Sequence, residues 1–314
     1  MITNPNVKIN LGLNVLRKRE DGFHDLETLF VPYFGISDTL EIIVGDDYSR
    51  TSAALFAKYG QQVPVSQGAV KPEGVFGVGT EEVAAPKLVQ GISEDGKLMI
   101  TIARAEGVDW DPLKDLTAKA YYILAEDFKL PPVKIFLEKT SPVGAGLGGG
   151  SADAAFALKM FNELCGLGLA EEQLAGYAAR LGSDCAFFIY NRPMIGEGRG
   201  EVLSESDMKL PFSCYPESGE EPFDLQVITP AGIAVSTKDA YAGIRPHLPE
   251  VPLREALSRP VEEWDGALVN DFEETVFAKY PELAAIKRSL YDCGAVYVSM
   301  SGSGSALFAV YRKS

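Results

Sequence analysis

The 314-residue chain contains few of the residues that build metal clusters, disulfide frameworks or membrane spans. It has only four cysteines, none in a CxxC spacing, and only two histidines, which disfavours a zinc-type site and a disulfide scaffold. No apolar run approaches the ~20 residues of a membrane-spanning helix. The first residues also lack the basic and apolar regions of a signal peptide. These shortages predict a cytoplasmic protein with reduced thiols and no membrane partner.

Positive charge is also scarce. The 29 Lys and Arg residues against 44 Asp and Glu residues give a formal net charge of −15. Such a field repels nucleic acid and anionic membranes, so we expect neither as a partner. An anionic substrate would instead need a local basic patch. The apolar content of 46% is that of an ordinary globular protein, and the length suffices for two domains.

Glycine, by contrast, is concentrated in residues 142–151, which read Pro-Val-Gly-Ala-Gly-Leu-Gly-Gly-Gly-Ser. The preceding residues 133–139 alternate like a strand, and Ala154, Leu158 and Phe161 then fall on one helical face. Glycines let backbone N–H groups approach a ligand closely, and a helix N-terminus favours negative charge. The pattern predicts a phosphate-binding loop with Ser151 at the helix cap. A flexible surface loop is the alternative.

The type of phosphate loop is not one of the common ones. The spacing Gly144-x-Gly146-x-x-Gly149 fits a dinucleotide fingerprint. However, the acidic pair at the required distance, residues 171–172, opens a helical pattern instead of ending a strand. Gly150-Ser151 also lacks the lysine of a Walker loop, and the protein-kinase motifs H-R-D and D-F-G are absent. A dinucleotide-dependent oxidoreductase therefore stays as a weaker alternative.

Periodicity and turn signals assign the rest of the chain. Expected strands lie at residues 7–16, 26–34, 39–44 and 97–104, and residues 46–94 are interpreted as an insertion. Asp111 and Pro112 predict a helix start, with the helix reaching about residue 128; two helices follow the glycine loop, the second ending near 182. The second half predicts a strand at 223–229, helices from 237 and near 252–258, 269–277 and 282–291, and two strands, 295–300 and 305–311, around a Gly-Ser turn.

Two polar features stand out within this pattern. Lys8 and Asn10 point the same way on the strand at 7–16, which alternates like a half-buried strand with one polar face. A solvated strand face is the alternative interpretation. Asp184 directly precedes an apolar run, a position where aspartate most often caps or turns the backbone.

Three separated motifs resemble those of the GHMP kinases, a superfamily that includes galactokinases, homoserine kinases and mevalonate kinases. They are Pro5-Asn6-Val7-Lys8-Ile9-Asn10-Leu11, the loop at 142–155, and Ser301-Gly302-Ser303-Gly304-Ser305. Further segments are similar to the branch of this family that acts on a cytidine diphosphate-linked methylerythritol. They are Arg19 with Asp21-Gly22-Phe23-His24, Leu26 and Thr28-Leu29-Phe30; residues 181–188; Glu197-Gly198-Arg199-Gly200-Glu201; and Asn270-Asp271-Phe272-Glu273. The chain departs from that pattern at Ser183, Cys185 and Ala186.

The resemblance implies a two-domain α+β fold with the active site in the interdomain cleft. An N-terminal, ATP-binding domain at 1–195, resembling domain 2 of ribosomal protein S5, would carry the insertion. A C-terminal GHMP kinase domain would occupy 196–314. The implied activity is ATP-dependent phosphorylation of the 2-hydroxyl of the cytidine-linked methylerythritol, in the non-mevalonate isoprenoid pathway. Another GHMP kinase, of the homoserine or mevalonate type, is the nearest alternative.

The resemblance also implies a role for each candidate residue. Lys8 and Asp184 would be catalytic, with ATP as phosphoryl donor and Mg²⁺ as the metal. The residues for the alcohol substrate would be Asn10, Phe23, His24 and Tyr241. The ATP site would comprise Lys139, Pro142, Gly144, Gly146, Leu147, Gly148, Gly149, Gly150 and Ser151, with Gly302, Ser303 and Gly304 from the third motif. Ser151 is also the candidate metal contact. A monomer or homodimer is expected.

Overall fold

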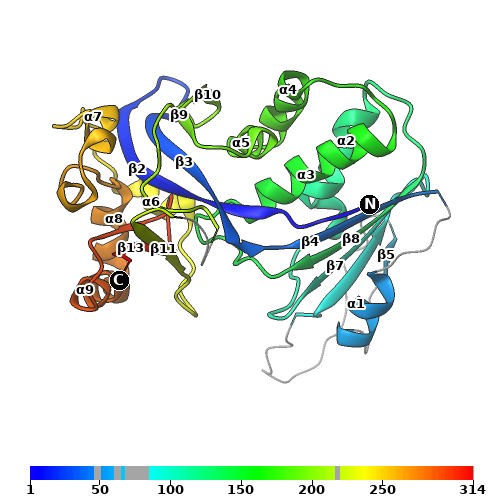
Figure 1. The fold of residues 1–314 in the computed structure, drawn as a ribbon. Helices are drawn as coiled ribbons and strands as arrows, with labels where there is room; N and C mark the ends of the chain where they lie inside the picture. The colour runs from blue at the N-terminus through cyan, green and yellow to red at the C-terminus, as the bar shows by residue number, and fades with distance from the viewer. Residues whose placement is uncertain (46–50, 60–64, 68–84, 216–219, 314) are drawn as a thin grey trace. The chain divides into compact units, whose positions relative to one another are not determined.

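The computed structural model describes residues 1–45, 51–59, 65–67, 85–215 and 220–313 (Figure 1). The chain forms two compact units, each assembled from separate stretches. The first unit comprises Met1–Pro5, Ser37–Ser141 and Gly150–Cys185. The second comprises Asn6–Ile36, Pro142–Gly149 and Ala186–Ser314. The two packing units therefore differ from the two predicted domains, 1–195 and 196–314. The boundary between those domains stays a prediction.

The first unit is built on a six-stranded sheet with the order β1-β4-β8-β7-β6-β5. β7 runs parallel to β8, and β4 pairs with β8 in antiparallel fashion, with Thr39 opposite Glu138. This places the carboxyl end of β8, just before the glycine loop, beside the start of β4. The strands are β1 (Ile2–Thr3), β4 (Thr39–Val44), β5 (Val65–Gln67), β6 (Leu88–Ile92), β7 (Leu98–Arg104) and β8 (Val133–Lys139).

Helices lie on both faces of this sheet, as Figure 1 shows. Leu55 of α1 packs with Ile43, Leu88 and Phe136 on one face. Ile135 and Leu137, which alternate with Phe136, are buried on the other face, where the longer helices lie. The helical elements are α1 (Ser52–Tyr59), η1 (Pro112–Lys114), α2 (Leu116–Ala125), α3 (Gly149–Leu164) and α4 (Glu171–Leu181).

Several predictions for this unit are confirmed, and two are wrong. β4 and β8 have the predicted bounds, and α4 ends at Leu181. The helix expected from Asp111 is instead a short 3-10 turn, because Asp115 accepts a hydrogen bond from the Thr117 amide and starts α2 anew at Leu116. Ser151 is not a cap, since α3 already begins at Gly149. Part of the insertion, at 46–50, 60–64 and 68–84, lies outside the described residues; its described part includes α1, β5 and β6.

The second unit contains two sheets, with the orders β10-β9-β3-β2 and β11-β13-β12. β12 and β13 pair in antiparallel fashion around the Gly-Ser turn, as predicted. The strands are β2 (Asn6–Lys18), β3 (His24–Ser37), β9 (Met194–Gly198), β10 (Val202–Glu205), β11 (Phe223–Ile228), β12 (Tyr297–Met300) and β13 (Leu307–Arg312). The helical elements are α5 (Cys185–Tyr190), α6 (Thr237–Ala242), α7 (Leu253–Ser258), η2 (Val261–Glu263), α8 (Phe272–Lys279) and α9 (Pro281–Asp292).

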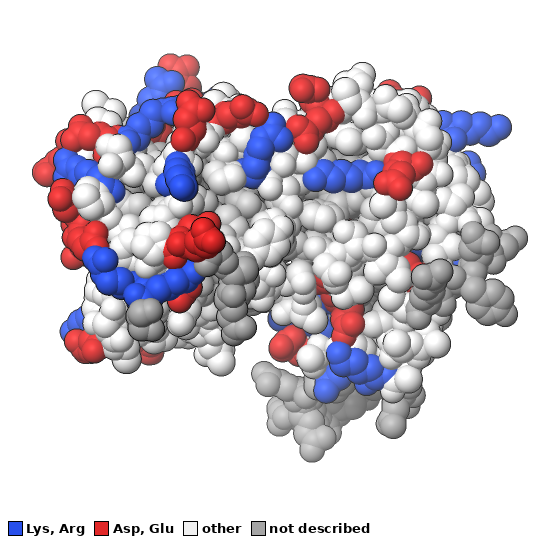
Figure 2. Space-filling model, viewed as in Figure 1, with Lys and Arg blue, Asp and Glu red and all other residues white. Residues whose placement is uncertain are grey.

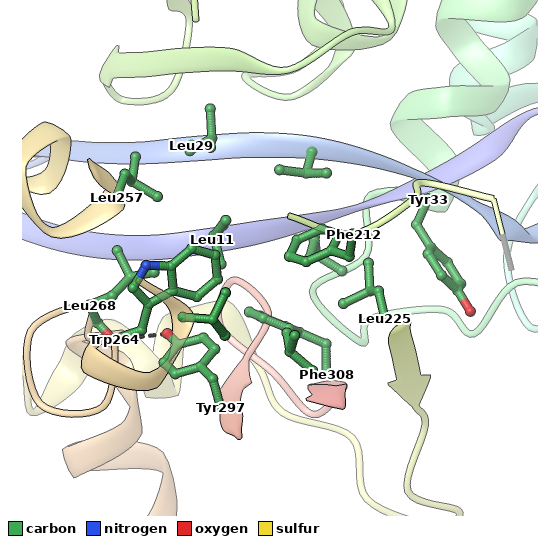
Figure 3. Packing of buried hydrophobic residues seen from close by; sticks show 14 of the residues in the cluster. Leu11, Leu29, Tyr33, Phe212, Leu225, Leu257, Trp264, Leu268, Tyr297 and Phe308 are labelled. Atoms are coloured by element: carbon green, nitrogen blue, oxygen red, sulfur yellow. Dashed lines mark hydrogen bonds between the residues drawn. The ribbon is translucent and has the colours of Figure 1, made fainter. Parts of the chain in front are cut away.

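The core of the second unit forms between its two sheets and the neighbouring helices (Figure 3). Leu11 of β2 and Leu29 of β3 belong to one cluster with Trp264 and Phe308. The buried hydroxyl of Tyr297 donates a 2.8 Å hydrogen bond to the Leu268 carbonyl, so this polar group is satisfied inside the apolar cluster.

β2 is buried on both faces, which corrects the prediction of a half-buried strand. All ten residues from Asn6 to Val15 are buried, including Lys8 and Asn10. The apolar face packs into the core of the unit. The polar face is covered because the glycine loop and the turn before β13 bond to it. A polar strand face that is covered in this way is a candidate site, since buried polar groups need partners.

The charges visible in Figure 2 are mixed in sign, with Lys and Arg side chains next to Asp and Glu side chains. Ion pairs of the second unit, such as Arg192–Glu205 and Arg199–Glu201, also join opposite charges near the surface. Among the described residues, no helix has the length and apolar content to cross a membrane.

Candidate active site

Lys8 is the centre of the polar face of β2. Its ammonium donates hydrogen bonds to Asn10 Oδ1 and to the Gly146 carbonyl, the latter at 3.0 Å. Its backbone N–H donates to the Leu147 carbonyl at 2.9 Å. The Nζ atom also lies 5.4 Å from the centroid of the Phe30 ring. Side chain and backbone of Lys8 are therefore both tied to the glycine loop, which brings two of the predicted elements together.

Asn10, two residues along the same face, is oriented by its own contacts. Its Nδ2 atom donates to Thr28 Oγ1 at 3.1 Å, and the Thr28 hydroxyl in turn donates to the Gly12 carbonyl. The Asn10 backbone N–H donates to Ser301 Oγ at 3.3 Å. These bonds fix the amide so that its oxygen faces Lys8.

The glycine loop packs closely against its neighbours at two glycines, one with no room for a Cβ and one where a Cβ would be crowded. A Cβ on Gly146, with φ of +76°, would lie 2.1 Å from the Ser301 carbonyl oxygen. A Cβ on Gly148, with φ of +73°, would lie 3.1 Å from the Phe188 ring and 3.3 Å from Lys8 Cε. Glycine thus keeps the backbone of this loop close to Lys8, as a phosphate-binding loop requires.

The third motif joins the same assembly. Ser301 Oγ donates to the Gly146 carbonyl at 3.0 Å, and the Ala306 N–H donates to the Ala145 carbonyl at 3.1 Å. Nδ2 of Asn270 donates to the carbonyls of Met300 and Gly302, at 2.7 and 2.9 Å. The strand β2, the glycine loop and the turn before β13 therefore converge within the second unit, although nearly 300 residues separate their ends in the sequence.

The two aromatic candidates for base recognition lie at the start of β3. Phe23 is 53% exposed, and the Arg199 guanidinium carbon lies 4.9 Å from its ring centroid. The His24 ring stacks on Tyr241, with centroids 4.9 Å apart and an interplanar angle of 24°. Burial, with a smaller effect of nearby Lys18, lowers the pKa of His24. The ring is therefore neutral at pH 7 and offers one donor and one acceptor.

The remaining candidates belong to the first unit. Asp184 is half-buried and accepts a 3.2 Å hydrogen bond from the Ser183 hydroxyl. Ser151 is the third residue of α3, and its hydroxyl hydrogen-bonds the Cys185 thiol. Lys139, expected beside the nucleotide, is buried between Asp38 and Asp153.

Sequence reasoning missed four polar residues that hold this machinery. Thr28 and Asn270 matched family segments but received no role, and their contacts to Asn10 and to the third motif show what they support. Asp153 lay within the motif at 142–155 but received no role, and Asp38 carried no signal apart from its charge. Among the described residues, no group of three or more His, Cys, Asp or Glu side chains could hold a metal ion.

The second unit also contains a cavity of about 580 Å³. It is lined by residues of 206–211, α7 and η2 together with Trp264, and none of the candidate site residues lines it. Its apolar walls, such as Trp264 and Ile195, are already almost fully buried. The cavity is thus a separate feature of the second unit, and it shares no residue with the candidate chemistry.

Comparison with known families agrees with this convergence of motifs. Residues 115–192 match the family model for the GHMP kinases N terminal domain, and residues 253–314 match that for the GHMP kinases C terminal domain. The chain belongs to the GHMP kinase family, with its two-domain fold of mixed α and β structure.

Within that family the chain is similar to proteins named 4-diphosphocytidyl-2-C-methyl-D-erythritol kinase. The protein of that name from Bacteroides fragilis is 40% identical over 311 residues, which covers 99% of this chain and 92% of the relative. The one from Bacteroides thetaiotaomicron is 41% identical over 312 residues, with the same coverage. A crystal structure of 4-(cytidine 5'-diphospho)-2C-methyl-D-erythritol kinase matches with a TM-score of 0.65 and 27% identity, over 98% of this chain and 89% of that one.

A homoserine kinase structure from Cytophaga hutchinsonii matches with a TM-score of 0.58. Its identity of 16%, over 98% of this chain and 86% of that one, shows a shared fold alone.

Proposed function

We propose that this protein transfers the terminal phosphoryl group of ATP to the 2-hydroxyl of 4-diphosphocytidyl-2-C-methyl-D-erythritol. The observation that supports this most directly is the convergence of Lys8, the glycine loop and the Ser301 turn within one unit. Relatives that share 40% of the sequence over 99% of the chain carry the name of this activity.

In the proposed reaction, Lys8 and Asp184 act on the substrate hydroxyl. Asp184 takes the hydroxyl proton or aligns the oxygen, and Lys8 polarises the same group. A weak base suffices, because a loose phosphoryl-transfer transition state depends on positioning and charge neutralisation more than on deprotonation. The role of Asp184 rests on the sequence resemblance, and that of Lys8 also on its bonds to the glycine loop.

The phosphates of ATP would be held by the backbone N–H groups of the glycine loop and by the N-terminus of α3. Gly146 has no room for a Cβ and Gly148 has little, which keeps that backbone close to Lys8. Mg²⁺ bound with the nucleotide would supply further positive charge, and Ser151 is the contact that we propose for it.

Recognition of the cytidine would fall to the start of β3. The exposed ring of Phe23 suits base stacking, worth about 1–3 kcal/mol per base. The neutral His24 ring, steadied by Tyr241, offers a donor and an acceptor to the edge of the base. Asn10 would contact a hydroxyl of the erythritol part. A hydrogen-bonding edge rejects analogues sharply, because a mismatch leaves a buried polar group without a partner.

The test is a comparison of kcat/KM for four alcohols: the cytidine-linked substrate, methylerythritol phosphate without the nucleotide, homoserine and mevalonate. Only the first should be turned over well. Phe23→Ala should depress its kcat/KM mainly through KM, since stacking is uniform binding. Comparable turnover of homoserine or mevalonate would overturn the substrate assignment and leave the kinase family. The cytoplasmic location and the monomeric or homodimeric state stay predictions.

A further inference from the structure

Lys139 lies in the first unit, at the last position of β8, in a buried cluster of charges. Its ammonium donates hydrogen bonds to Asp38 Oδ2 and Asp153 Oδ2, each at 2.5 Å. Lys139 is only 5% exposed, and both aspartates are 1% exposed. Nothing in the proposed reaction uses this cluster, yet two buried carboxylates around one ammonium are costly to assemble.

The Asp38 carboxylate ties down the residues immediately before the glycine loop. Its Oδ1 atom accepts the backbone N–H groups of Thr140 and Ser141, at 2.6 and 2.7 Å. Its Oδ2 atom accepts the Ser141 hydroxyl at 2.7 Å in addition to Lys139. Asp38 is the single residue between β3 and β4, and its own N–H donates to the Pro5 carbonyl at 2.9 Å. Ser141, which precedes Pro142, is thereby fixed to the end of the sheet where β8 finishes and β4 begins.

Asp153 ties down the other end of the loop. It is the fifth residue of α3, one turn beyond Gly149, where the loop becomes helical. Its Oδ2 atom bonds to Lys139, whereas Oδ1 has no hydrogen-bond partner among the described residues. The ammonium of Lys139 thus joins the chain before the loop to the helix after it.

The loop is bonded to Lys8 and Ser301 at its middle, and its two ends need restraint of their own. Gly144, Gly146 and Gly148 all have positive φ, between +71° and +76°. Glycine adopts many other backbone conformations, so the sequence of the loop does not itself fix one. Anchoring both ends limits the conformations that remain and lowers the entropy cost of ordering the loop around a ligand.

We propose that Asp38, Lys139 and Asp153 form a loop clamp, a set of positioning residues that holds the glycine loop in the conformation that binds ATP. Lys139 then supports nucleotide binding through the position of the loop and not through direct contact. This inference rests on the proposed function for its ligand, ATP, while the geometry of the clamp does not depend on it.

Asp38→Asn is the decisive variant because asparagine keeps the shape but replaces one acceptor oxygen with an NH₂ group, which would face donors. We expect the dissociation constant of a non-hydrolysable ATP analogue, measured by calorimetry, to rise at least tenfold. The KM of the alcohol substrate should stay within twofold. In the protein without nucleotide, amide hydrogen exchange should accelerate at 143–149 more than in the strands of the same sheet. Glu138→Gln is the matched control, since Glu138 neighbours Lys139 on β8 but bonds Lys58 and Tyr59.

If Asp38→Asn does not fold, Ser141→Ala takes its place, since it removes one neutral donor to Asp38 and leaves every charge. We then expect the dissociation constant of the ATP analogue to rise twofold to fivefold, and amide exchange to accelerate at 143–149 as in Asp38→Asn. Unchanged analogue affinity in a folded variant, or exchange that accelerates evenly across the unit, would overturn the clamp. If the unaltered protein does not bind the analogue, the proposed function fails, and the exchange comparison still decides the clamp.

Discussion

Two buried lysines, one in each compact unit, differ in what surrounds their ammonium groups. Lys8 is 2% exposed and donates to two neutral oxygens, the Asn10 amide and the Gly146 carbonyl. Lys139 is 5% exposed and donates to the carboxyl groups of Asp38 and Asp153. The Lys8 ammonium bonds to the glycine loop itself, whereas the Lys139 ammonium joins the residues before and after that loop. We therefore propose that Lys8 acts directly on the substrate hydroxyl and that Lys139 acts through the position of the backbone.

The largest expected effect is on turnover. Lys8→Met should lower kcat by on the order of 10²–10⁴, because it removes the positive charge beside the reacting oxygen. The cost in stability should be smaller, about 1–3 kcal/mol for the acceptors left without a donor. Steady-state kinetics and urea unfolding measure the two quantities on one preparation. A near-normal kcat in Lys8→Met would show that Lys8 takes no part in the reaction and would leave no functional difference between Lys8 and Lys139.

Lys139→Met should instead reduce the stability of the protein more than its kcat. Removing the ammonium leaves the buried Asp38 carboxylate without its counter-ion, a change that typically destabilises by about 3–5 kcal/mol. The urea midpoint should fall at an unchanged slope. Lys58→Met is the control, because the Lys58–Glu138 pair adjoins the same strand but its lysine side chain is 60% exposed. Such exposed pairs contribute about 0–1 kcal/mol. Equal losses of unfolding free energy in Lys139→Met and Lys58→Met would show that the buried cluster stabilises the protein no more than an exposed ion pair does.

Two glycines of the loop provide a finer test. Gly148→Ala should weaken an ATP analogue about tenfold, or about 1.4 kcal/mol, because its Cβ meets the Phe188 ring and Lys8 Cε. Gly144→Ala has a comparable positive φ but open space around its Cβ. Gly144→Ala should therefore lower the stability through backbone strain and leave the affinity for the ATP analogue almost unchanged. Calorimetric titration of both variants decides the matter, with circular dichroism as the folding control. Equal affinities would mean that the crowding at Gly148 does not matter for binding.

The sequence predicted those parts of the site that local patterns encode. The alternation of 133–139 gave the bounds of β8, and the glycine spacing after it marked the loop. The alternation of β2 placed Lys8 and Asn10 on one face, which their hydrogen bond confirms. Local patterns could not show that this polar face is buried, since its cover comes from residues as distant as Ser301.

The clamp was beyond sequence reasoning for the same physical reason. Asp38 and Lys139 are 101 residues apart, and they meet only because β4 pairs with β8. A lone aspartate between two strands is ordinarily a turn residue. Lys139 accordingly resembled a nucleotide ligand by its position alone, while the pairing of strands determined its partners.

The smallest expected effect concerns the excess carboxylate of the clamp. Burial raises the pKa of Asp153 well above its ordinary range, against the opposing effect of the Lys139 charge. The pKa of Asp38 is lowered instead; its burial works against ionisation, but the Lys139 charge and the bonds that Asp38 accepts outweigh it. Asp38 and Lys139 are therefore the ion pair, and Asp153 retains its proton to higher pH than an exposed aspartate does. Asp153→Asn mimics that protonated form.

The stability difference between Asp153→Asn and the unaltered protein should therefore depend on pH. Below the unfolded pKa of about 3.9, Asp153 is protonated in both the native and the unfolded chain, and the difference is smallest. As the pH rises from there towards the native pKa, the unfolded chain releases the proton while the native chain keeps it. The unaltered protein then loses up to about 1.4 kcal/mol per pH unit relative to the variant, which has no such proton. Urea unfolding at intervals between pH 4.5 and 8 measures this divergence, and two parallel stability curves would show instead that Asp153 ionises in the native state as an exposed aspartate does.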